Sequence, residues 1–325
     1  GFEFAQPNVK PFACKNIVFR NCTVANGGTA NLVYTDSFAD NVATAQALGY
    51  SPIIDPLHET NISFEGIVGK GQGAGSAIGM RVIQQRGGIF RACDVSYFLS
   101  GINVDEQVYG FTIEACHTHF NRQDGVDIHH GSLLPEDVIV RDLHSHDNGQ
   151  DTAGYSESSG IRIGGSRRVI VERGRFGRAG ANDPTQRNCI RVVAGALATV
   201  IREPHCRSAR AVNGRGVVIL SGTSFNQFGL MEGVRFEPSY IPTLYTGLEA
   251  VPVKRSTYFS NGLTNTEYLS NSGNTLIGLA VIQGDIIRYG DTAAGASPGR
   301  IAVASGTVDA GNLATLTRPL PALAA

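Results

Sequence analysis

The chain has 325 residues and a net charge of -1, and only 17% of its residues are charged, against about a quarter in a typical soluble domain. Because 27 basic residues balance 28 acidic ones, no basic field exists to attract nucleic acid, and we expect no nucleic-acid partner. No apolar run approaches the roughly 18 residues that a membrane-spanning helix needs, so we expect no membrane insertion. The 40 glycines and 13 prolines favour turns and strands.

A short apolar-x-apolar strand pattern recurs along the chain. Its copies are 45, 26, 23, 27, 31 and 30 residues apart and begin at Ile17, Ile62, Gly88, Phe111, Val138, Val169 and Thr199. A second pattern, Gly-apolar-x-apolar, falls between them at 79–82, 101–104, 125–128, 160–163 and 216–219, with 189–192 as a variant. Two short strands per period, separated by Asn, Gly and Asp, predict the coils of a parallel β-solenoid.

The same register predicts the domain organisation. We expect an all-β chain with a parallel β-helix over residues 1–222 and a smaller β-rich region over 223–325 that trimerises or caps the helix. A segment inserted at about 34–58 has a helix pattern between Asp36 and Gly49. Residues 1–4 match the second strand pattern, so we expect the chain to begin in mid-coil, as a fragment of something longer would.

The six cysteines lack the paired spacing of a zinc ribbon. If each period is one coil, three of them fall in a single column, which reads Cys22, Ile67, Cys93, Cys116, Leu143 and Gly174. We predict buried thiols in an interior ladder. A disulfide between Cys93 and Cys116 on adjacent coils is the alternative.

Side chains alternate along a strand, so the residue between the two apolar positions of the second strand should face outward. This column reads Glu3, Val33 in a less secure register, Arg81, Asn103, Asp127, Arg162, Arg191 and Val218. An acid between cations on consecutive coils is a candidate groove floor for a long polymer, because the face repeats about every 4.8 Å. The alternative is a ladder of surface ion pairs without a function.

Carboxyl groups accumulate near Asp127. Glycosidic cleavage needs one carboxyl to protonate the leaving oxygen and a second to attack or to activate water. We predict Asp127, ionised beside Arg162, as base or nucleophile, with Asp124 or Glu157 as the acid. For Asp124, a turn residue whose side chain hydrogen-bonds its own local backbone is an equally good interpretation.

Six of the eight histidines lie between residues 117 and 146. His129, beside the candidate floor, is a candidate general base and His130 a substrate contact, with Asp105 and Glu106 stacked below them. The substrate-binding set is then Arg81, Asn103, Arg162, Arg191, His130 and Tyr155. The pairs His117/His119 and His144/His146 occupy equivalent positions one coil apart, beside Asp94 and Asp147, and predict an exposed polar ladder, with a metal site as the alternative. We expect no cofactor.

The coil pattern over residues 1–222 and the Asn121-to-Asp127 run resemble the right-handed parallel β-helix of the pectin-lyase-like superfamily. Residues 284–288 and 293–299 resemble segments that follow such helices in bacteriophage tailspikes. Polygalacturonase-like hydrolases of the superfamily use an Asn-x-Asp-Gly-apolar-Asp run that Asp124 and Asp127 would match, but their Asp-Asp pair and Gly-His-Gly element have no counterpart here.

The resemblance implies an extracellular or virion-tail homotrimer that binds and hydrolyses a bacterial capsule or O-antigen. Two alternatives remain open. In a lyase or epimerase, His129 or Tyr155 would take a proton from a uronate whose carboxylate is neutralised by Arg162 or Arg191. In a non-catalytic adhesin, the same face would only bind glycan.

Overall fold

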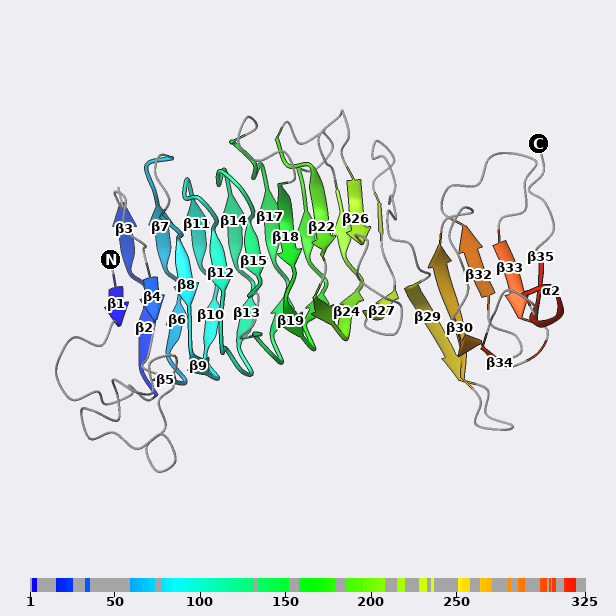
Figure 1. Cartoon of the computed structure of the whole chain (residues 1–325). Helices are drawn as coiled ribbons and strands as arrows, with labels where there is room; N and C mark the ends of the chain where they lie inside the picture. The colour runs from blue at the N-terminus through cyan, green and yellow to red at the C-terminus, as the bar shows by residue number, and fades with distance from the viewer. Residues whose placement is uncertain are drawn as a thin grey trace, which may run out of the picture.

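The computed structural model of the chain is a parallel β-helix followed by a smaller β-rich part (Figure 1). It describes residues 2–4, 16–25, 33–35, 59–73, 77–130, 134–151, 158–178, 185–193, 195–207, 215–219, 228–232, 235–236, 251–257, 264–270, 280–281, 286–289, 299–302, 304, 306–307 and 313–319.

Three parallel sheets of eight strands form the helix, and each coil contributes one strand to each sheet. Sheet 1 contains β1 (Phe2–Phe4), β4 (Val33–Thr35), β8 (Met80–Val82), β12 (Ile102–Val104), β15 (Val126–Ile128), β18 (Ser159–Ile163), β22 (Asn188–Val192) and β26 (Arg215–Ile219). Sheet 2 contains β2 (Val18–Arg20), β6 (Ser63–Glu65), β10 (Ile89–Arg91), β13 (Thr112–Glu114), β16 (Ile139–Arg141), β20 (Ile170–Glu172), β24 (Thr199–Arg202) and β27 (Phe228–Glu232). Sheet 3 contains β3 (Thr23–Ala25), β7 (Val68–Lys70), β11 (Asp94–Ser96), β14 (His117–His119), β17 (His144–His146), β21 (Arg175–Phe176), β25 (His205–Cys206) and β28 (Arg235–Phe236).

Sheets 1 and 2 contain the strands that the sequence predicts, with β27 as an addition beyond the predicted end, and the predicted parallel β-helix is confirmed. Sheet 3 was not predicted, because its strands are two or three residues long and several of their buried positions carry a small or polar residue, such as Gly69, Thr118 or Ser145, instead of an apolar one. A minor ladder at the corner between sheets 1 and 2 joins β5 (Glu59–Thr60) to β9 (Gln85–Arg86) and β19 (Ser166–Arg167) to β23 (Ala196–Leu197).

The corner between sheets 2 and 3 uses one residue with positive φ in each coil whose corner the structure describes. Gly66 occupies it in one coil, and in the others the residues are Asn21, Ala92, Ala115, Asp142, Arg173 and Glu203, with φ between 49° and 54°. A left-handed residue reverses the chain within a single step, so successive strands of the two sheets can follow each other with almost no loop. The corner therefore repeats at the same place in each coil and keeps the sheets in register.

The interior of the helix is a set of apolar columns. Phe64 and Phe90 are 0% exposed, and their rings pack 5.8 Å apart in an edge-on arrangement. Cys93 and Cys116 are 1% exposed and carry free thiols, which confirms these two members of the predicted buried ladder and excludes the alternative disulfide between them, whereas Cys22 is only half-buried. Burial of these columns is the main favourable term in the folding of such a coil.

An amide ladder replaces the apolar column where sheet 3 turns toward sheet 1. The side chain of Asn121 donates to Asn148 Oδ1 at 2.9 Å, and Asn148 Nδ2 donates to Gln186 Oε1 at 3.0 Å. All three residues are 0% exposed. Each coil thus passes one side-chain hydrogen bond to the next, which satisfies polar groups that would otherwise be costly to bury.

The strand ladders pass the expected end of the helix at residue 222, since β27 pairs with β24 and β28 pairs with β25 as far as Phe236. The division of the chain into two domains remains a prediction. The helix expected between Asp36 and Gly49, and most of the 34–58 insertion, lie outside the described residues.

The C-terminal part contains a mixed sheet. Its order is β29 (Val251–Thr257), β30 (Thr264–Ser270), β32 (Ile286–Tyr289), β33 (Gly299–Ala302) and β35 (Thr317–Pro319), and β30 and β32 run parallel. A two-stranded ladder of β31 (Ala280–Val281) and β34 (Gly306–Thr307) and the short helix α2 (Leu313–Leu316) complete it. Among the described residues, no helix is long and apolar enough to cross a membrane.

Candidate functional site

A row of polar side chains runs along sheet 1, one from each of five consecutive strands. Parallel pairing places Arg81 beside Asn103, Asn103 beside Asp127, Asp127 beside Arg162, and Arg162 beside Arg191. On β8, β15, β18 and β22 this residue stands between two fully buried apolar residues and is itself partly exposed, so it faces outward. We call Arg81, Asn103, Asp127, Arg162 and Arg191 the polar ladder, and their predicted neighbourhood is confirmed.

The predicted column was wrong in register at Val33 and in exposure at Val218, whereas Glu3 pairs with Tyr34 and keeps its place. Tyr34, not Val33, pairs with Arg81, and Val33 is 0% exposed in the core. Val218 keeps its position beside Arg191 but is also 0% exposed. Among the residues whose side chains the structure describes, the polar part of the column therefore runs from β8 to β22.

Two ion pairs connect neighbouring coils within this face. Arg162 Nη1 donates to both Asp127 oxygens, at 3.0 and 3.2 Å. Arg81 Nη2 donates to Asp105 Oδ2 at 2.6 Å. The Asp127 and Asp105 side chains are only 14% and 13% exposed, so both pairs are shielded from water and are stronger than ordinary surface pairs.

Asp127 and His129 follow each other on the outward face of the same strand, and their pKa values shift in opposite directions. Burial raises the pKa of Asp127 and outweighs the opposing effects of Arg162 and His129, while the charge of Asp105 adds to the increase. Burial and the charge of Arg162 lower the pKa of His129. Arg162 lowers the pKa of Asp127, as we expected, but the pKa is raised overall because the cost of burying the carboxylate is larger than the gain from the arginine.

His129 lies over the glycine of the next coil. A methyl group at Gly164 would come within 2.6 Å of His129 Cδ2 and 2.7 Å of Val193 Cγ2. The missing side chain at Gly164 thus makes room for the imidazole. His130 Nε2 lies 3.3 Å from Glu106 Oε2, as the predicted stacking of these residues requires.

Asn103 is the neutral member of the polar ladder. It is 6% exposed, and its Oδ1 has no hydrogen-bond partner among the described residues. A buried acceptor without a partner is costly in an isolated protein, so this atom is suited to accept a hydrogen bond from a bound molecule.

Asp124 does not belong to this face. It is 1% exposed, and its Oδ1 accepts a hydrogen bond from the Ser159 backbone amide at 2.7 Å. A buried carboxylate that fixes the turn between two coils cannot protonate a polymer in solvent, so we assign Asp124 a structural role. Glu157 and Tyr155 lie outside the described residues.

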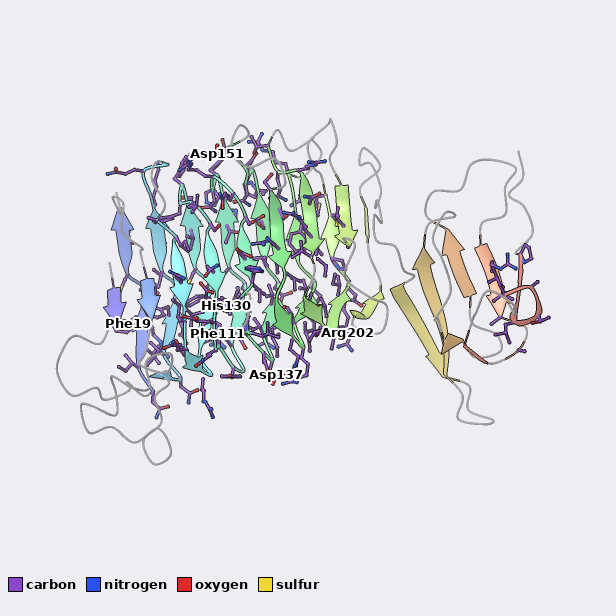
Figure 2. The ribbon with its side chains drawn as sticks, in the orientation of Figure 1. Phe19, Phe111, His130, Asp137, Asp151 and Arg202 are labelled. Atoms are coloured by element: carbon purple, nitrogen blue, oxygen red, sulfur yellow. The ribbon has the colours of Figure 1, made fainter. Side chains whose placement is uncertain are left out.

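Asp105 is the site residue that we did not include in the predicted catalytic set. It directly follows β12, two positions after Asn103, and its register position is beside His129 of the next coil. Strand alternation extended by one residue beyond Val104 would have placed it on the outward face. Figure 2 shows the neighbouring His130 at the middle of the helix, away from the edges where Asp137 and Asp151 lie.

Metal-ligand groupings do not occur in the polar ladder. In the part of the chain that the structure describes, the groups of His, Cys, Asp and Glu that are close enough to share an ion are His117/His144/His146 and Asp94/His117/His119. Both lie on sheet 3.

Solved structures that are similar to this chain include the following two. The first, "The complex structure of XylC with xylose", is 12% identical, with a TM-score of 0.40. The match covers 62% of this chain and 38% of that chain. The second, the A-module of mannuronan C-5 epimerase AlgE4 from Azotobacter vinelandii, is 11% identical with a TM-score of 0.40 and covers 74% of this chain and 72% of that one. No family model and no curated protein matches.

Proposed function

We propose that the outward face of sheet 1 binds a polysaccharide and hydrolyses it. The observation that carries this proposal is the pair of shielded carboxyls on consecutive coils, Asp127 with a raised pKa and Asp105 held by Arg81. Two carboxyls in different environments are the arrangement that glycoside hydrolysis uses, with one protonated and one ionised.

In this mechanism Asp127 is the general acid. Its proton passes to the glycosidic oxygen as the bond between that oxygen and the anomeric carbon breaks. A water molecule adds to the anomeric carbon and gives a proton to Asp105. Arg162, which donates to Asp127 in the free protein, then holds the carboxylate that forms.

The cations of the polar ladder suit an acidic glycan. Arg81, Arg162 and Arg191 lie on one face of the helix, and neighbouring strands are about 4.8 Å apart. Guanidinium groups bind carboxylates in a two-pronged geometry, so a uronate polymer lying along the axis could meet several of them. Asn103 Oδ1 would accept a sugar hydroxyl.

A second candidate function is supported by His129. Because its pKa is lowered, the imidazole is neutral over a wider pH range and can remove a proton from the C5 position of a uronate. Arg162 and Arg191 would then stabilise the charge on the uronate carboxylate. This chemistry gives a lyase or an epimerase rather than a hydrolase.

The broader setting that we propose is a tailspike-like depolymerase. Its polymer would be a bacterial capsule or O-antigen, its assembly a homotrimer, and its location extracellular or in a virion tail. The support is the sequence of residues 284–299, which resembles segments that follow β-helices in tailspikes. A non-catalytic adhesin would use the same surface. Analytical ultracentrifugation tests the trimer directly.

The deciding experiment is product analysis with a panel of acidic capsules and O-antigens. New reducing ends without unsaturated-uronate absorbance support hydrolysis. Unsaturated absorbance supports elimination, and a changed C5 configuration in an intact polymer, seen by NMR, supports epimerisation. A polymer that is bound but chemically unchanged overturns the enzymatic proposal in favour of an adhesin.

A further inference from the structure

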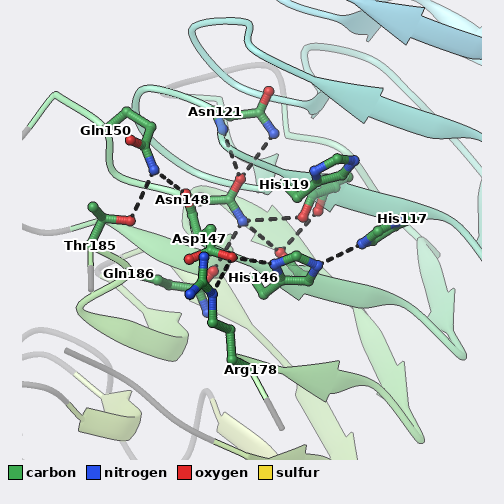
Figure 3. Close-up of polar contacts among 12 residues, drawn as sticks. His117, His119, Asn121, His146, Asp147, Asn148, Gln150, Arg178, Thr185 and Gln186 are labelled. Atoms are coloured by element: carbon green, nitrogen blue, oxygen red, sulfur yellow. Dashed lines mark hydrogen bonds and ion pairs between the residues drawn. The ribbon is translucent and has the colours of Figure 1, made fainter. Parts of the chain in front are cut away.

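We infer that sheet 3 carries a site for one transition-metal ion of the zinc class, with His117, His144 and His146 as ligands. The parallel pairing of β14 and β17 places His117 beside His144 and His119 beside His146. Between them, Thr118 and Ser145 are 0% exposed and point into the helix, so the four imidazoles lie together on the outer face. Figure 3 shows His117, His119 and His146 gathered at this surface.

The nitrogen atoms of three of these rings converge. Nε2 of His117 and Nε2 of His146 are 2.8 Å apart, and one ligand nitrogen from each of His117, His144 and His146 lies within 4.8 Å of the others. Nitrogens bound to one tetrahedral zinc at about 2.0–2.1 Å are roughly 3.3–3.4 Å apart. Small ring movements would therefore bring all three onto one ion.

Carboxylates already hold two of the rings in the orientation that a metal needs. Nδ1 of His146 lies 2.7 Å from Asp147 Oδ2, and Asp147 in turn accepts a hydrogen bond from Arg178 Nε at 2.7 Å. Nδ1 of His117 lies 3.4 Å from Asp94 Oδ2. A metal-bound histidine typically donates its other nitrogen to a carboxylate in this way, which fixes the tautomer and directs the free nitrogen at the metal.

The burial of the supporting groups separates this arrangement from an ordinary surface ladder. Asp147 is 1% exposed, while the His146 side chain is 17% exposed and stays accessible to an ion from solvent. His119 does not join the three ligands, because its Nε2 lies 2.8 Å from Asp94 Oδ1. Its ring instead packs beside that of His117, with centroids 4.2 Å apart.

Three imidazole ligands define the kind of ion and leave a coordination position open. Imidazole favours Zn²⁺, Cu²⁺, Ni²⁺ and Co²⁺ over Mg²⁺ and Ca²⁺, which prefer oxygen. With three protein ligands, a tetrahedral ion keeps its fourth position for water or for a ligand in solution. Because His117 and His144 come from different coils, the bound ion would also join β14 to β17. The site is independent of the proposed chemistry on sheet 1.

The test uses the full chain without a histidine tag, treated with chelator and titrated with zinc chloride by calorimetry. We expect saturable binding of one Zn²⁺ per chain, at least about 10-fold weaker in His117→Gln and in His146→Gln. Asp147→Asn should weaken it by about 10–100-fold. His205→Gln, on β25 of the same sheet, should bind zinc like the parent. Circular dichroism checks that each variant is folded.

Cobalt provides a measurement that needs no variant. Co²⁺ bound by three imidazoles and water in a tetrahedral site gives strong visible absorption, and we expect one equivalent to produce it. Absence of saturable zinc uptake, or the weak spectrum of octahedral Co²⁺ in the parent chain, would overturn the site. Unchanged zinc affinity in folded His117→Gln and His146→Gln would overturn it as well.

Discussion

Arg162 on β18 donates through Nη1 to both carboxylate oxygens of Asp127 on β15, one coil away, at 3.0 and 3.2 Å. The arginine does not keep the pKa of Asp127 low, because burial raises that pKa by more than the ion pair lowers it. An arginine beside a buried acid can therefore support proton donation, since it stabilises the carboxylate that forms when the proton leaves.

Asp127→Asn should lower the rate of polysaccharide cleavage by about 10²–10⁴-fold, the usual contribution of a general acid. Substrate binding should change little, because the amide keeps the shape of the carboxyl. Asp137→Asn is the matched control, since Asp137 is likewise paired with an arginine of the next coil, Arg168, but is 53% exposed at an edge of the helix. Full activity of Asp127→Asn would show that the site lies elsewhere.

The pH dependence of the rate separates the two proposed chemistries. Hydrolysis needs protonated Asp127, so activity should fall as pH rises through a pKa above the ordinary 3.8 of an aspartate. Elimination needs neutral His129, so activity should rise with pH through a pKa below the ordinary 6.5 of histidine. A pH–rate profile on the cleaved polymer measures this, and a rate that does not vary with pH contradicts both assignments.

Gly164→Ala should displace His129, because the added methyl would lie 2.6 Å from its Cδ2 atom and 2.7 Å from Val193 Cγ2. We expect a stability loss of about 1–3 kcal/mol from overpacking and, for the lyase or epimerase chemistry that uses His129, an activity loss of up to about 100-fold from the misplaced ring. Urea denaturation and initial rates measure the two effects.

The double variant Gly164→Ala/Val193→Ala provides the control for that substitution. It removes the contact with Val193 but keeps the contact with His129. Stability should therefore recover in part while activity stays low. Recovery of both would mean that the position of His129 does not matter to the reaction.

Phe90→Ala should destabilise the β-helix by about 3–5 kcal/mol, as expected for a fully buried ring that leaves a cavity. The ring packs edge-on against Phe64 and Phe111, at 5.8 and 4.8 Å, so the loss affects three consecutive coils. Val18→Ala, in the same sheet but 46% exposed, should stay within about 0.5 kcal/mol of the parent. Equal effects of the two substitutions in chemical denaturation would contradict this description of the core.

The sequence alone determined the coil register. Gly-apolar-x-apolar repeats placed Asn103 beside Asp127 and Asp127 beside Arg162, and the interior cysteine column followed from the same spacing. This was possible because a solenoid converts a sequence period into a spatial neighbour, and strand alternation then decides which side chains face outward.

Only the tertiary structure decided the chemistry within that frame. Asp124 and Asp127 belong to one short run, but Asp124 points into a turn and Asp127 faces outward. The position of Asp124 depends on its hydrogen bond from the Ser159 backbone amide, which exists only when the next coil is stacked. The direction of the Asp127 pKa shift depends on how much water the neighbouring coils exclude. The hydrogen bonds that link His146 to Asp147 and Asp147 to Arg178 depend on side-chain orientation. Neither exclusion of water nor orientation is encoded in spacing, since both arise from atoms that residues far apart in the chain bring together.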